Sequence, residues 1–320
     1  MKVTLDLSQL LQEGKISPAE AERLRVLAAG DTSALAINIL VGFGVVAVSA
    51  GALALIPTLL TVIVVGLVLS AIGLAFTLQG KEQWSLLAQI CLVIGVLLFC
   101  GGVYALGDGS LAAMLVVTAT LAGAAIVARS GLLMAAAVLA LGGCLGAHAG
   151  YWSAAYMLTI LEPSVTIVLF GVLALATYYL SKSLSADYER LALIAARTSV
   201  FMVNFGFWIG SLMGDYAPLI RALLSENSSA VIDVSDTPLI PPLPFVIGWA
   251  LVLIGAGIWA VRENRRWVVN IVAVFAAIHF YTQWFERLGF NPITVVAGGL
   301  LMLAVAVGLW RFNQRFAQRA

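Results

Sequence analysis

The sequence predicts an all-α polytopic integral membrane protein with ten transmembrane helices and an N-terminal cytoplasmic helical hairpin. Hydrophobic residues make up 62% of the 320 residues and charged residues only 10%, whereas charged residues make up about 25% of an ordinary soluble domain. A membrane-crossing helix needs about 20 largely apolar residues, and ten runs of the chain meet this requirement. Arginine and lysine also gather on one side of these runs, which supports the predicted number of spans.

Residues 1–31 are predicted to form the cytoplasmic amphipathic helical hairpin, on the basis of the stretch LLQEGKISPAEAERL at residues 10–24. Gly14 suits the end of a first helix because glycine tolerates a left-handed backbone. Ser17 and Glu20 have the spacing of a capping box, and Pro18 suits the first helical position. Two helices this short bury too little area to be stable alone. The hairpin therefore needs a surface to lie on: a partner protein, a second copy of the chain, or the rest of this chain.

Residues 32–320 are predicted to form the transmembrane domain, with an outer (periplasmic) loop at about residues 214–243. The predicted spans are 34–55, 57–78, 84–106, 111–128, 131–149, 163–181, 192–213, 244–261, 267–285 and 292–310.

The positive charges test this number of spans independently. With the N-terminus in the cytoplasm, the inner side carries 15 lysines and arginines, and the outer side carries only Arg221 and Arg287. Such a bias is typical of inner-membrane proteins, so both chain termini are predicted to be cytoplasmic. Each half of the chain holds five spans, and because five is odd the second half would be inverted relative to the first.

The seventh predicted span carries a stripe of polar residues. Arg190, Arg197 and Asn204 recur every seven residues, and this spacing places them on one helix face. In one interpretation Arg197 lies at the start of the span and its side chain reaches the inner headgroups. In another, the stripe lines a polar cavity in which Arg197 meets an anionic headgroup or solute. A third interpretation pairs Arg197 with Asp187 or Glu189. The three residues of the stripe are candidate solute or headgroup contacts.

A second group of polar residues lies near the predicted outer end of the ninth span. His279 and Gln283 are four residues apart, so they share a helix face, and Glu286 follows. This pattern indicates a shallow outer-facing polar site in which His279 is the titrating group. The alternative is an interfacial belt of aromatic residues, here Tyr281 and Trp284, with incidental polar neighbours.

The fifth predicted span has glycines at positions 142, 146 and 150. Small residues at every fourth position let two helices approach closely in a membrane. We therefore expect Gly142, Gly146 and Gly150 to form one face of a tight helix seam.

Several function classes receive no support from the sequence. The net charge of +1 provides no basic surface for nucleic acid. The chain lacks the common hydrolase and nucleotide-binding motifs, so no catalytic residue, cofactor or metal site is predicted and enzyme activity is disfavoured. Cys91, Cys100 and Cys144 lie in apolar runs without a Cys-x-x-Cys pair, which predicts small packed residues. The spans also contain no aspartate, glutamate or lysine, although ion-coupled carriers commonly place a carboxylate at mid-membrane.

The hairpin stretch LLQEGKISPAEAERL, together with the C-terminal stretch FYTQWFERLGFNPITVVAGGLLMLAVAVGLWRFNQR, resembles a widespread family of uncharacterised bacterial membrane proteins, the family of domain of unknown function 2157. The resemblance concerns the order of parts over nearly the whole chain. It implies a multi-pass protein of the bacterial plasma (inner) membrane, and it implies no catalytic residue.

Two functions are compatible with these observations. The first is an inner-membrane protein that binds or transports a small amphiphilic or lipid-like solute. The second is a membrane scaffold or sensor subunit that docks a membrane or periplasmic protein through the hairpin and the outer loop. In either case the lipid bilayer is a partner, and the hairpin is compatible with a homo-oligomer.

Overall fold

The computed structural model describes residues 10–11, 15–79, 84–152, 155–217 and 237–317. The chain forms two compact units, Met1–Ala140 and Leu141–Ala320, and their boundary falls inside helix α6. The first unit contains α2 (Pro18–Leu55), α3 (Leu59–Gln79), α4 (Ser85–Leu106), α5 (Leu111–Ala128) and most of α6 (Gly131–Gly143). The second contains β1 (His148–Trp152), β2 (Ala155–Thr159), α7 (Pro163–Ser181), α8 (Ala186–Met213), α10 (Pro242–Arg262), α11 (Arg266–Leu288) and α12 (Pro292–Ala317).

The prediction of a multi-pass membrane protein agrees with the length and apolar composition of the helices. Among the described residues, seven helices are long and apolar enough to cross a membrane, namely α3, α4, α5, α7, α8, α10 and α11. The first, fifth and tenth predicted spans coincide with shorter apolar helical stretches, Leu40–Leu55, Gly131–Gly143 and Pro292–Gly308. The helices therefore make the chain a multi-pass membrane protein, while the number of ten spans stays a prediction.

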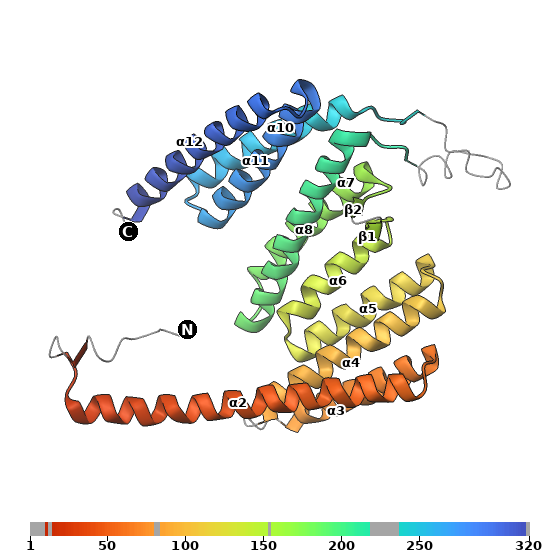
Figure 1. Cartoon of the computed structure of the whole chain (residues 1–320), viewed down its shortest axis with the longest axis vertical. Coiled ribbons are helices and arrows are strands. Elements are labelled where there is room, and N and C mark those ends of the chain that lie inside the picture. The colour runs from red at the N-terminus through yellow and green to blue at the C-terminus, as the bar shows by residue number, and fades with distance from the viewer. Residues whose placement is uncertain (1–9, 12–14, 80–83, 153–154, 218–236, 318–320) are drawn as a thin grey trace. The chain divides into compact units, whose positions relative to one another are not determined.

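The N-terminal cap forms as the sequence predicts, while the predicted first helix of the hairpin and Gly14 lie largely outside the described residues, which here are 10–11 and 15 onward. The Ser17 hydroxyl accepts a hydrogen bond from the backbone N–H of Glu20 (3.2 Å), and the Glu20 carboxylate accepts one from the backbone N–H of Ser17 (2.9 Å). The helix that begins here, α2, continues without a break for 38 residues, which is about 57 Å at 1.5 Å per residue. The predicted boundary at residue 31 therefore lies within a continuous helix, and the second helix of the hairpin leads directly into the first apolar stretch (Figure 1).

Helices α3 and α4 pack unusually closely because glycines face each other across the contact. A Cβ atom on Gly95 would lie 2.4 Å from the backbone nitrogen of Ser70, and one on Gly73 would lie 2.5 Å from that of Leu92. Real side chains do not tolerate such distances, so these positions require glycine. Gly66 makes the same kind of contact with Phe99. A small-residue seam is therefore present in the protein, between α3 and α4.

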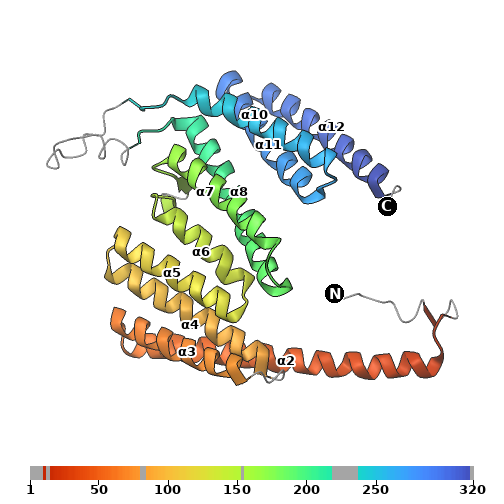
Figure 2. The same cartoon turned by 180° about the vertical axis from the view of Figure 1, so that it is seen from behind.

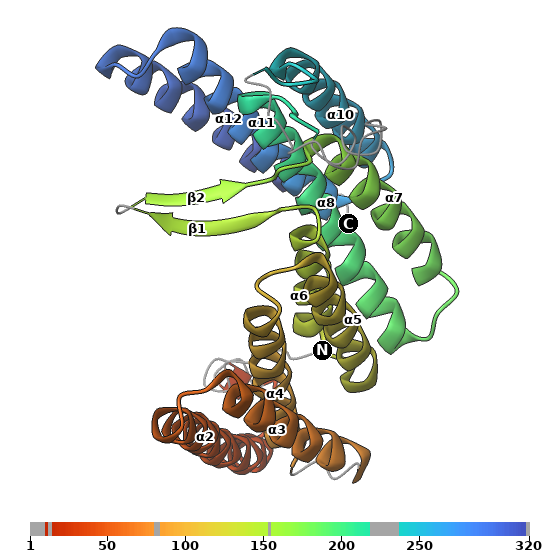
Figure 3. The same cartoon turned by 90° about the vertical axis from the view of Figure 1, so that its right-hand side faces the viewer.

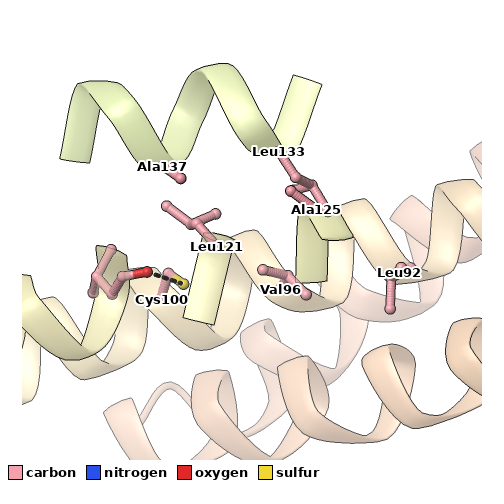
Figure 4. Packing of buried hydrophobic residues seen from close by; sticks show 8 residues of the cluster. Leu92, Val96, Cys100, Leu121, Ala125, Leu133 and Ala137 are labelled. Atoms are coloured by element: carbon pink, nitrogen blue, oxygen red, sulfur yellow. Dashed lines mark hydrogen bonds between the residues drawn. The ribbon is translucent and has the colours of Figure 1, made fainter. Parts of the chain in front are cut away.

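A hydrophobic core joins α4, α5 and α6 (Figure 4). Leu92 and Val96 of α4, Leu121 of α5, and Leu133 and Ala137 of α6 are all buried in it. Of the three cysteines predicted to be packed residues, Cys91 and Cys100 are buried and Cys144 is half-buried. The Cys100 thiol donates a 3.9 Å hydrogen bond to the carbonyl oxygen of Val117.

The prediction of a fifth span over residues 131–149 is wrong at its C-terminal end. Helix α6 stops at Gly143, and strands β1 and β2 then pair antiparallel, with His148 opposite Thr159 and Trp152 opposite Ala155 (Figure 3). Gly146 adopts a left-handed conformation (φ +75°) between the helix and the first strand. An apolar run alone does not distinguish helix from strand, so the sequence pattern did not reveal where the helix ends.

The predicted seam of Gly142, Gly146 and Gly150 is wrong for the same reason. Gly142 lies in the last turn of α6 and contacts Met202, whereas Gly146 packs against Leu161 in the following turn. Gly150 belongs to strand β1. The three glycines therefore do not share a helix face.

The predicted outer loop begins and ends in an ordered junction, while residues 218–236 lie outside the described part of the chain. Asp215 and Ile240 exchange two backbone hydrogen bonds of 2.8 and 3.1 Å. The Asp215 side chain is fully buried and accepts hydrogen bonds from the backbone N–H groups of Ser164 (2.9 Å) and Ala217 (2.7 Å). Asp215 thus joins the two ends of the loop through its backbone and connects them to the first turn of α7 through its carboxylate.

Candidate functional site

The second unit contains all five predicted site residues, on the neighbouring helices α8 and α11 (Figure 2). Arg190 and Arg197 are exposed on α8, whereas Asn204 is buried. The seven-residue spacing places the three on one stripe of the helix, yet they meet different surroundings along its length. The stripe therefore does not line a single polar cavity.

Arg197 lies against an aromatic ring. Its guanidinium carbon is 5.1 Å from the centre of the Trp267 ring, at the start of α11. A guanidinium over an indole face is attracted by the ring's electron density while its edges stay open to water or headgroups. This placement of an exposed Arg197 agrees with the interpretation in which the side chain lies near the end of its span.

Asn204 serves as a packing hydrogen-bond partner inside the helix bundle. Its side-chain oxygen accepts a 2.9 Å hydrogen bond from the indole nitrogen of Trp249 on α10, and its amide nitrogen donates to the carbonyl of Val200. Trp249 is completely buried, and Asn204 is 7% exposed. A buried indole N–H needs such an acceptor, so the amide of Asn204 is used within the protein.

Trp249 also connects this contact to the second predicted group. Its ring meets the imidazole of His279 edge to face, with centroids 4.8 Å apart, and it packs against Phe275 as well. The sequence reasoning did not select Trp249, because a tryptophan inside an apolar span looks like any other core residue. Its role depends on the two partners that the fold brings to it.

His279 and Gln283 do lie in a common site. They line an open groove of about 470 Å³ beside α10 and the end of α11. Its remaining lining residues are Val246, Phe280, Trp284, Arg287 and Leu288. His279, Gln283 and Arg287 follow each other at intervals of four residues, so they form a polar edge along one side of α11. The Nδ1 atom of His279 has no hydrogen-bond partner within the described part of the chain.

A second groove continues along the same helix toward its N-terminus. It has a volume of about 420 Å³ and is apolar throughout, with walls from α10, α11 and α12. Phe280 borders both grooves. The apolar groove is lined by Gly257, Val261, Val269, Val272, Ala273, Ala276, Ala277, Phe280, Leu301, Met302 and Val305.

Hydrogen bonds between aromatic side chains and neighbouring helices hold α11 in place beside these grooves. The Trp284 indole donates to the carbonyl of Thr294 (3.1 Å), and the Tyr281 hydroxyl donates to the carbonyl of Gly298 (3.2 Å), both on α12. On the other side, the Trp208 indole of α8 donates to the Thr282 hydroxyl (3.0 Å). The aromatic residues predicted as an interfacial belt thus also fasten the helices together.

Among the described residues, no group of three or more histidine, cysteine, aspartate or glutamate side chains is placed to hold a metal ion. Helix α11 borders a groove with a polar edge and then the apolar groove. This order is suited to a molecule with a polar end and a hydrocarbon end.

The fold thus defines a multi-pass membrane protein with an open amphipathic groove in its C-terminal unit. No family model, curated protein or solved structure matches the chain. The resemblance to the uncharacterised bacterial family therefore stays an expectation from the sequence.

Proposed function

We propose that this protein binds, and moves within or across the membrane, a small amphiphilic or lipid-like solute. The observation that supports this proposal is the sequence of two grooves along one side of α11, the first edged by His279 and Gln283 and the second wholly apolar. The hydrocarbon part of the solute lies in the apolar groove, and its polar part lies beside the polar edge. Of the predicted site residues, His279 and Gln283 are the solute contacts, while Arg190 and Arg197 serve as contacts for inner headgroups.

This proposal includes the finer membrane topology. Ten helices cross a bacterial inner membrane with both termini in the cytoplasm, as supported by the 15 to 2 distribution of positive charge. The unit boundary at residues 140 and 141 lies near the division between two halves of five helices. It supports the existence of two halves.

The binding proposal is tested by filling the apolar groove. Ala273 lies on its wall, so Ala273→Phe places an aromatic ring where the hydrocarbon chain would lie. Protein in lipid nanodiscs is exposed to an alkyl probe with a photoreactive diazirine in its chain, and crosslinked peptides are identified by mass spectrometry. We expect crosslinks to the groove walls on α11 and α12 in the wild type and their loss in the variant.

The matched control is Ala119→Phe, the same change at an exposed position of α5 outside the groove. It should leave the crosslinks on α11 and α12 intact. Equal crosslinking of these helices in both variants would contradict the proposed binding site. Proteoliposomes with a fluorescent lipid then test movement: exchange between leaflets should be faster than in protein-free liposomes, and Ala273→Phe should remove the acceleration.

The scaffold or sensor function is favoured by one observation, the unbroken helix α2. A continuous helix from the Ser17 cap to the apolar stretch ending at Leu55 would transmit the position of a bound partner to the membrane domain. Removing residues 1–30 distinguishes the two functions. Under the solute proposal the crosslinks on α11 and α12 persist after this truncation, and under the scaffold function a partner captured by the full chain is lost.

A further inference from the structure

We infer that the solute held along α11 is an anionic amphiphile whose negatively charged head lies against Arg287. This inference rests on the proposed function, and it adds the chemical class of the solute. Arg287 lines the polar groove together with Gln283 and His279. Among the described residues, no negatively charged side chain lines this groove, so the one permanently charged group that they contribute is a cation.

Glu286, the carboxylate next to Arg287 in the sequence, does not add a negative charge to the wall of the groove. Successive residues of a helix point about 100° apart, because 3.6 residues make one turn. Glu286 is exposed and is absent from the groove wall, whereas Arg287 belongs to it. The guanidinium has five N–H donors that match the oxygens of a carboxylate or phosphate, and the Gln283 amide adds a further donor beside it.

The location of Arg287 in the predicted topology supports a specific role. Arg287 and Arg221 are the only two of the 17 basic residues on the predicted outer side. The positive-inside bias acts against a basic residue in a short outer segment. An arginine that lines an open groove at this position is readily explained by a ligand of opposite charge.

The length of the apolar groove indicates how the solute is oriented. Its wall on α11 extends from Phe280 to Val269, which corresponds to about 16 Å along a helix. The hydrocarbon core of a bilayer is about 30 Å thick, so one leaflet contributes about 15 Å. A single alkyl chain about 15 Å long with its head against Arg287 would therefore end about ten residues earlier on α11, within the apolar groove.

The test compares three probes that separate the head from the tail. Dodecyl phosphate is anionic, dodecylphosphocholine has the same chain with a zwitterionic head, and inorganic phosphate has no chain. Binding of each to the full-length protein in a neutral detergent is measured by native mass spectrometry. We expect the wild type to prefer dodecyl phosphate over dodecylphosphocholine by about tenfold or more, the scale of a charge-assisted hydrogen bond, and to bind inorganic phosphate far more weakly.

Arg287→Gln should reduce this preference to near unity, and Arg287→Lys should retain most of it because the charge remains. Arg265→Gln is the matched control, since Arg265 is exposed at the opposite end of α11 and outside the groove. Size-exclusion chromatography verifies that each variant is folded.

The outcomes separate the two proposals. Equal binding of both amphiphiles by the wild type, or an unchanged preference in Arg287→Gln, overturns the inference of an anionic head. If Ala273→Phe still abolishes binding in that case, the proposed amphiphile site stands. Inorganic phosphate bound as tightly as dodecyl phosphate would show an anion site with no use for the chain, and would also overturn the inference. If Ala273→Phe changes the binding of neither amphiphile, the proposed function itself fails.

Discussion

Trp249 connects the polar residues that the sequence shows as separate groups. Its indole nitrogen binds Asn204 on α8, and its ring contacts His279 on α11, so α8, α10 and α11 meet at one buried side chain. Hydrogen bonds between helices matter in a membrane because water is not available as an alternative partner. Asn204 thereby fixes the wall from which His279 reaches the groove.

At this scale we predict that Asn204→Leu destabilises the protein by about 1–2 kcal/mol, because the buried Trp249 N–H loses its acceptor. Thermal unfolding of the purified protein in detergent measures the effect. Asn270→Leu makes the same change at an exposed position of α11 and should be nearly neutral. If Asn204→Leu costs the same in a Trp249→Phe background as in the wild type, the hydrogen bond is not the source of the stability.

At the scale of the helices, the sequence predicts a helix end more readily than a contact between two helices. A capping box is a local pattern, and the one at Ser17 and Glu20 forms as predicted. Close packing between α3 and α4 depends instead on glycines from both helices meeting at one level. Many glycines in the chain have open space around them, so the sequence alone does not reveal which of them form a contact.

We predict that the cap of α2 weakens at acidic pH. Hydrogen bonds from the Ser17 backbone and hydroxyl lower the pKa of Glu20 below its ordinary value. Because the pKa is lower in the folded helix, the contribution is complete above the unfolded pKa and is lost as the pH falls through the folded one. Hydrogen exchange of the first-turn amides, corrected for intrinsic rates, should show this loss of protection. Ser17→Ala should weaken the helix start by about 1 kcal/mol at neutral pH and remove most of the pH dependence.

For the α3–α4 seam we predict that Gly95→Ala destabilises the protein by about 1–3 kcal/mol, because its methyl group would collide with the Ser70 backbone. Gly101→Ala in the same helix is the control, since nothing lies within 4 Å of the added Cβ there. Alanine also favours a helix more than glycine does, so the control should be neutral or slightly stabilising. Equal unfolding temperatures for the two variants would contradict the seam.

At the scale of the whole molecule, the property to be tested is the number of helices that cross the membrane. Helix α6 has 13 residues, or about 20 Å at 1.5 Å per residue, which is shorter than the roughly 30 Å hydrocarbon core. A turn after Gly143 and the start of strand β1 at His148 occupy the end of the predicted span. The fifth crossing is therefore the one that most needs a test.

We predict that single cysteines at positions 110 and 161 are labelled from outside intact cells and that those at positions 129 and 183 are protected. The native residues Ser110, Arg129, Leu161 and Ser183 are all exposed near helix ends, and Cys91, Cys100 and Cys144 are replaced beforehand. A membrane-impermeant maleimide reports the side. Protection of position 161 together with position 129 would show that α6 does not cross, and labelling of position 129 would contradict the ten-span topology.

The sequence by itself determined the membrane class, the cap of α2 and seven helices long and apolar enough to cross a membrane. These properties are read along one helix at a time: apolar length, the identity of capping residues and the placement of charge. The same reasoning placed His279 and Gln283 on one face of a helix, because residues four apart share a helix face whatever surrounds the helix.

Only the tertiary structure decided which faces of different helices meet. It placed Asn204 against Trp249, moved the glycine seam to α3 and α4, and joined Arg287 to the polar groove. It also ended α6 at Gly143, where the chain turns into a β-hairpin. In a chain this apolar nearly every helix face is compatible with burial or lipid, so hydrophobicity does not select the partner faces. Close approach, paired hydrogen bonds and the shape of a groove select them, and these arise only when the helices pack.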